Sequence, residues 1–155
     1  MHSVIDNRFF DKFDKDENTV VMLIYLNRPF NFHTLQNLHK ISSCTIVADG
    51  AANRFYDNCK KASIQYKINS FSTNISLSEV FFPHILVGDF DSIKKNVMEF
   101  YKTRDVQIVH NASQDDTDLE KCLKHLQMKF LDEGLYDQTK QYKIIIAGGL
   151  GGRLD

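Results

Sequence analysis

With 155 residues and a mass of 18.0 kDa, the chain is long enough for one domain with a sizeable buried core. Its net charge of −1 argues against a field that attracts nucleic acid or an anionic membrane, and 43% hydrophobic with 25% charged residues is ordinary for a globular protein. No apolar run approaches the roughly 20 residues of a transmembrane helix, and the polar N-terminus lacks the apolar core of a signal peptide. The three cysteines are far apart and odd in number, as expected of reduced thiols. We therefore expect a cytoplasmic protein that binds neither nucleic acid nor membranes.

Short β-rich runs alternate along the chain with longer runs of helical spacing. Residues 1–19 are expected to form a flexible N-terminal arm, and residues 20–155 an α/β domain. The predicted strands are residues 20–26, 44–48, 84–87, 106–109 and 142–147. Helices are predicted within residues 32–41, 51–59, 93–101 and 119–130. Residues 62–79 are polar and poorly periodic, and we expect a long loop or an insertion there.

This alternation predicts an open, mostly parallel sheet of the Rossmann-like kind, with helices on both faces. Ligands of such sheets bind beyond the carboxyl ends of the strands. Stretches rich in acids or glycine occur in four such places, at residues 49–50, 88–92, 114–118 and 148–153. We therefore expect these four stretches to meet at one site.

Asp89 and Asp91 follow the strand predicted at residues 84–87. Two carboxylates this close repel each other unless a cation lies between them. Because Mg²⁺ takes carboxylate oxygens together with phosphates, the pair predicts a metal site that also holds phosphate. The structural alternative is a helix N-cap at Asp91 or Ser92 beside one solvated acid. A cap needs only one of the two acids, so we favour the metal site.

Asp115 and Asp118 are three residues apart at an expected helix start, where Ser113 and Asp116 resemble a capping arrangement. On one helix face, the two carboxylates could bind a ligand or only complement the helix dipole. Lys121 lies one turn beyond Asp118, as its salt-bridge partner or as a phosphate contact. The spacing leaves these alternatives open.

Gly148, Gly149, Gly151 and Gly152 follow the last predicted strand, and Arg153 comes next. The turn is not a Walker loop, because no Lys-Ser or Lys-Thr pair follows the glycines. It still exposes backbone N–H groups, and the arginine adds a forked phosphate donor. The structural alternative is a flexible chain end.

Four stretches resemble, in order, the signature of the thiamine pyrophosphokinase family: VADGAAN at 47–53, VGDFDSI at 87–93, QDDTDLEK at 114–121 and GGLGGRLD at 148–155. The resemblance runs from about residue 20 to the end. It implies an α/β catalytic domain that binds ATP and Mg²⁺ and transfers pyrophosphate to the hydroxyl of thiamine, with release of AMP. It also implies a homodimer in the full-length family.

The resemblance assigns roles by position. Asp89, Asp91 and Asp118 match acids expected around Mg²⁺ and the phosphates, as metal ligands and catalytic residues. Gln114 matches a position near thiamine or its hydroxyl. The other positions expected to bind substrate or nucleotide are Asp49, Gly50, Asn53, Asp115, Lys121, Gly148, Gly149, Gly151, Gly152, Arg153 and Asp155.

The family continues beyond the position of Asp155, into more of the α/β domain and a β-sandwich domain that contributes to the thiamine pocket. We therefore expect a sheet that is incomplete at its C-terminal end, weak nucleotide binding and poor turnover. One alternative is a phosphatase of the haloacid-dehalogenase type with Asp89 as nucleophile, although Ser92 stands where Thr or Val is usual. The other is a non-catalytic fragment that binds nucleotide or dimerises.

Overall fold

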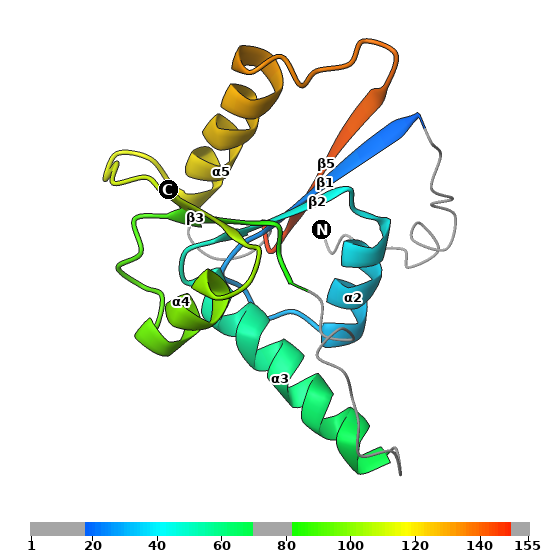
Figure 1. Cartoon of the computed structure of the whole chain (residues 1–155), viewed down its shortest axis with the longest axis vertical. Helices are drawn as coiled ribbons and strands as arrows, with labels where there is room; N and C mark the ends of the chain where they lie inside the picture. Colours follow the sequence, from blue (N-terminus) through cyan, green and yellow to red (C-terminus); the bar gives the residue numbers. More distant parts are fainter. Residues whose placement is uncertain (1–17, 70–81, 150–155) are drawn as a thin grey trace, which may run out of the picture.

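The computed structural model describes residues 18–69 and 82–149 of the chain. Within these residues, five parallel strands form one sheet in the order β4-β3-β2-β1-β5 (Figure 1). The strands are β1 (Thr19–Tyr25), β2 (Cys44–Ala48), β3 (Ile85–Gly88), β4 (Gln107–His110) and β5 (Gln141–Ala147). Each lies within one residue of its predicted bounds, and the predicted fold class is confirmed.

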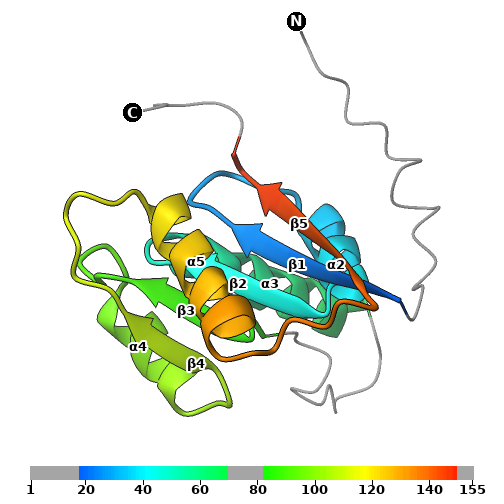
Figure 2. The ribbon, with the colours of Figure 1, turned by 90° about the horizontal axis from the view of Figure 1, so that it is seen from above.

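Helices cover both faces of the sheet (Figure 2). One face carries α2 (Phe32–Ile41), α3 (Ala51–Asn69) and α4 (Lys95–Lys102), and the other carries α5 (Asp118–Gln127) with a π-helical turn, η2 (Met128–Asp132). Alternate residues of β1 enter the two cores, with Leu23 on the α3 side and Ile24 on the α5 side. Burial on both faces explains why the central strands are continuously apolar. None of the helices in the described segments has the length and apolar character needed to span a membrane.

Among the described residues, β5 is the edge strand on this side of the sheet, and it pairs along its length with β1. Ile144 and Ile146 of this edge strand are 46% and 40% exposed. That the sheet is incomplete beyond β5 stays a prediction.

The loop expected at residues 62–79 is wrong in its first part, because α3 continues to Asn69. Residues 60–69 contain no glycine or proline, and each added residue of a helix gains a backbone hydrogen bond. Residues 70–81 lie outside the described residues. Of the predicted arm, residues 1–17 also lie outside them, whereas Thr19 already belongs to β1.

The cap predicted for α4 is wrong. This helix begins at Lys95, with Lys94 at the N-cap position and no side-chain hydrogen bond to the helix end. Asp91 and Ser92 lie in the turn before it, so their side chains remain available to the sheet edge.

The cap predicted for α5 is also wrong, since Thr117 caps this helix instead of Ser113. The Thr117 hydroxyl accepts a hydrogen bond from the Glu120 backbone N–H at 3.3 Å, and the Glu120 carboxylate accepts one from the Thr117 N–H at 2.7 Å. Two overlapping patterns compete here, and Thr-x-x-Glu provides the reciprocal bond of a capping box.

The capping box predicts the relative stability of two variants. Thr117→Ala should lower the free energy of unfolding by about 1 kcal/mol, because it removes the N-cap acceptor. Ser113→Ala should change it by less than about 0.5 kcal/mol. Urea denaturation measures both values, and equal losses would contradict the observed cap.

Candidate active site

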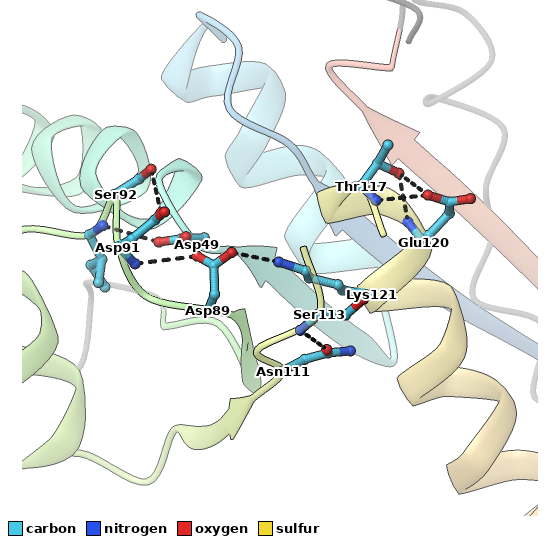
Figure 3. A network of polar contacts seen from close by, with 10 residues as sticks. Asp49, Asp89, Asp91, Ser92, Asn111, Ser113, Thr117, Glu120 and Lys121 are labelled. Carbon is cyan, nitrogen blue, oxygen red and sulfur yellow. Dashed lines mark hydrogen bonds and ion pairs between the residues drawn. The ribbon is translucent and has the colours of Figure 1, made fainter. Parts of the chain in front are cut away.

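A tight turn after β3 carries Asp89 and Asp91 at the carboxyl edge of the sheet (Figure 3). Phe90 between them has a φ of 68°, a left-handed conformation that is uncommon for residues other than glycine. Its ring packs against His110, with ring centroids 5.7 Å apart. The Asp91 N–H donates a hydrogen bond to Asp89 Oδ1 at 3.3 Å. Packing and hydrogen bonding thus hold both carboxylates in one compact turn.

Asp49 joins this pair from the end of the neighbouring strand β2, where it is only 2% exposed. Its Oδ1 accepts a hydrogen bond from the Ile93 N–H at 3.0 Å. A Cβ at Gly88 would lie 2.6 Å from the Cβ of Asp49, so glycine is what allows Asp49 this position. One carboxylate oxygen from each of Asp49, Asp89 and Asp91 lies within 4.8 Å of the other two. We call these three residues the carboxylate cluster.

Lys121 of α5 supplies one compensating charge. Its Nζ lies 2.7 Å from Asp89 Oδ2, and its side chain is 3% exposed. This ammonium group holds the pKa of Asp89 well below its usual range. Burial, together with the nearby Asp89, raises the pKa of Asp49 to about 7. The cluster therefore carries more negative charge than Lys121 balances, and its oxygen ligands suit a hard divalent cation such as Mg²⁺.

The predicted metal ligands and the observed cluster differ by one residue, because the cluster contains Asp49 and not Asp118. Asp118 is the first residue of α5, and its pKa is raised by burial and by the negative charges of the cluster. Its role as a metal ligand stays a prediction. The ion-pair partner of Lys121 is Asp89 and not the expected Asp118, whereas a phosphate contact of Lys121 stays a prediction.

Asp115 does not share a helix face with Asp118, because Asp115 precedes the N-cap Thr117, so that prediction is wrong. Asp115 and Gln114 are both exposed on the connection before α5. Their predicted contacts with substrate stay predictions.

Asn53, in the first turns of α3, holds the segment that follows Asp91. Its Nδ2 donates a hydrogen bond to the Ser92 carbonyl at 3.0 Å, and its Oδ1 accepts one from the Lys94 N–H at 2.9 Å. Both ends of the amide are therefore used to position the turn. Gly50 lies beside the same turn, since a Cβ there would meet the Ser92 Cβ at 3.2 Å.

Gly148 and Gly149 directly follow β5, at the same edge of the sheet. Gly148 has a φ of 87° and packs closely on Arg28. The other residues predicted for this turn, Gly151, Gly152, Arg153 and Asp155, lie outside the described residues.

Sequence reasoning missed two polar residues at this edge. Arg54 of α3 donates a hydrogen bond from Nε to Oδ1 of Asn27, which follows β1, at 2.8 Å. The position of Asn27 after a strand, like that of Asp49, could have indicated its place at this edge. It was passed over because the pattern sought at strand ends consisted of acidic residues and glycines.

Residues 35–155 match the model of the catalytic domain of thiamin pyrophosphokinase. The chain belongs to this family. Thiamine pyrophosphokinase 1 of Arabidopsis thaliana is 31% identical over 114 residues, which cover 71% of this chain and 38% of the relative. Thiamine pyrophosphokinase of Saccharomyces cerevisiae is 29% identical over 121 residues, which cover 76% of this chain and 33% of the relative. The chain thus spans little more than a third of the length of these relatives.

The crystal structure of yeast thiamin pyrophosphokinase has the same fold, with a TM-score of 0.67 at 21% identity. The match covers 89% of this chain and 51% of the yeast chain. The resemblance to thiamine pyrophosphokinases seen in the sequence is therefore confirmed at the level of family and fold.

The raised pKa of Asp49 predicts that metal binding by this family member depends on pH. Below about 7, Asp49 of the metal-free protein is protonated, and a metal ion must displace that proton. The affinity for Mn²⁺, measured by titration calorimetry, should therefore rise about tenfold from pH 6 to pH 8.

Two variants provide the comparison. Asp49→Asn should bind Mn²⁺ more weakly and lose this rise, since it has no proton to release. Asp105→Asn, on the exposed connection before β4, should keep both the affinity and its pH dependence. An unchanged pH profile in Asp49→Asn would contradict the role given to Asp49.

Proposed function

We propose that this chain provides the Mg²⁺- and ATP-binding part of a thiamine pyrophosphokinase, which transfers pyrophosphate from ATP to the hydroxyl of thiamine and releases AMP. The observation that carries the proposal is the carboxylate cluster with the buried Lys121, at the sheet edge where open α/β folds bind their ligands. Family membership supports the same reaction.

The donor set fits Mg²⁺, because all three side chains of the cluster offer hard oxygen ligands. When bound, Mg²⁺ supplies neutralisation of phosphate charge, which is the main requirement of such transfers. Asp89 and Asp91 would hold the ion, and Asp49 would join them after losing its proton.

The remaining residues position the site. Lys121 keeps Asp89 ionised and fixes one of its oxygens. Asn53 fixes the turn after Asp91. We propose nucleotide contacts for the N–H groups of the glycine turn after β5, and a place near the thiamine hydroxyl for Gln114.

The proposal also covers the location of the protein, its substrates and its oligomeric state. We propose a cytoplasmic enzyme that acts on ATP and thiamine, forms a homodimer in its full-length form and binds neither nucleic acid nor membranes. The thiamine pocket of the whole enzyme is proposed to involve a β-sandwich domain that follows the α/β domain. The phosphatase alternative is not favoured by the family match.

The reaction can be tested with the chain, ATP, Mg²⁺ and thiamine, with AMP and thiamine diphosphate measured by chromatography. Slow product formation is expected, and Asp89→Asn should lower its rate further, by at least about 100-fold, because both the metal ligand and the charge next to Lys121 are lost. Asp105→Asn is the matched control and should retain the rate.

The outcomes separate the alternatives. A rise in melting temperature with Mg²⁺ and ATP but no product would favour a nucleotide-binding fragment. A phospho-aspartate trapped at Asp89 would favour the phosphatase.

A further inference from the structure

The carboxyl edge of the sheet has a cationic side next to its acidic side. In the strand order, β1 lies between β5 and β2 (Figure 2), so its end lies between the strand followed by Gly148 and the strand followed by Asp49. Asn27 and Arg28 follow β1, and Arg54 reaches Asn27 from α3 with an Nε–Oδ1 distance of 2.8 Å. Two arginines therefore lie at the end of β1, next to the strand that is followed by Asp49.

Two glycines allow the residues after β1 to approach the neighbouring segments closely. A Cβ at Gly50 would lie 3.0 Å from Asn27 Nδ2 and 3.2 Å from the Ser92 Cβ, so Asn27 and the turn after Asp91 approach each other here. On the other flank, a Cβ at Gly148 would lie 3.0 Å from the Arg28 Cβ. Asn27 thus lies near the turn after Asp91, and Arg28 packs against Gly148 on the other flank.

Arg54 is held through its side chain and Arg28 through its backbone, and both have unused side-chain donors. The Arg28 carbonyl accepts a hydrogen bond from the hydroxyl of the buried Tyr25 at 3.2 Å. The hydrogen bond from Arg54 to Asn27 engages only the Nε of the guanidinium. Among residues 18–61 and 82–149, whose side chains are described, neither the Nη groups of Arg54 nor the Arg28 guanidinium has a hydrogen-bond or ion-pair partner.

We propose that Arg54, oriented by Asn27, and Arg28 bind the phosphate chain of the nucleotide, which would run from Gly148 across the end of β1 to the carboxylate cluster. The inference rests on the proposed function, since it assumes a nucleotide with several phosphates. Three carboxylates repel such an anion, and Lys121 with one divalent ion offsets that repulsion in part. A guanidinium whose Nε is already engaged still offers its Nη donors to phosphate oxygens in a fixed plane.

The test is binding of inorganic tripolyphosphate and of ATP with Mg²⁺ to the 155-residue chain, measured by titration calorimetry. Arg54→Gln should weaken both ligands about tenfold. Arg54→Lys should recover part of the loss, because it restores charge without the planar fork. Asn27→Ala should weaken both ligands several-fold through loss of orientation.

Lys61→Gln is the matched control. It removes one positive charge from the exposed surface of the same helix, about two turns further from the sheet edge, and should leave both affinities within about twofold. Arg54 is exposed, and a thermal melt of each variant should show an unchanged fold.

Equal tripolyphosphate affinity in Arg54→Gln and the unaltered chain would overturn the inference, as would the absence of tripolyphosphate binding by the unaltered chain. A failure of the proposed function would give a different result from a failure of the anion site. If Arg54→Gln loses tripolyphosphate affinity while the unaltered chain forms no thiamine diphosphate, the anion site stands and the reaction does not. If the chain forms thiamine diphosphate and Arg54→Gln binds normally, the reaction stands and the anion site does not.

Discussion

Repulsion among three carboxylates is the constraint on which the rest of the site depends. Asp49 and Asp89 come from the ends of adjacent parallel strands, and the register that pairs Ala48 with Val87 places Asp49 beside Gly88, one residue before Asp89. Because the carboxyls are close together and partly buried, it is unfavourable for all of them to be ionised at once. Lys121 stabilises the charge of Asp89, whereas Asp49 keeps its proton up to a pH of about 7. A divalent cation would relieve the repulsion that remains.

Specific residues around the carboxylate cluster hold its three carboxylates close together despite their repulsion. Gly88 leaves space for Asp49, and Phe90 adopts a left-handed conformation supported by its contact with His110. Asn53 ties the next residues to α3 through two backbone hydrogen bonds. Strain of this kind persists only where neighbouring structure over-determines it, as is common at ligand sites. The well-packed cores on both faces of the sheet provide that support.

Much of the fold and the site's position could be predicted from the sequence, because strand period, helix period and the strand-end rule are local or topological signals. Asp89 and Asp91 were found in this way. The contact between Lys121 and Asp89 joins residues 32 apart and leaves no trace in local spacing. The same holds for Arg54 and Asn27, and for Asp49, which the resemblance placed in the site but not among the metal ligands. Helix ends were mispredicted where two patterns overlapped, as at Ser113 and Thr117, where the reciprocal hydrogen bonds between Thr117 and Glu120 form the cap.

The central claim is that the carboxylate cluster holds a divalent ion against the phosphates of a nucleotide. Crystals of the chain grown with Mn²⁺ and a non-hydrolysable ATP analogue would test it through the anomalous scattering of manganese. We expect a manganese peak about 2.1 Å from carboxylate oxygens of Asp89 and Asp91, with analogue phosphate oxygens completing its coordination. Bound analogue with no manganese at these carboxylates, or manganese held at a different part of the chain, would contradict the account.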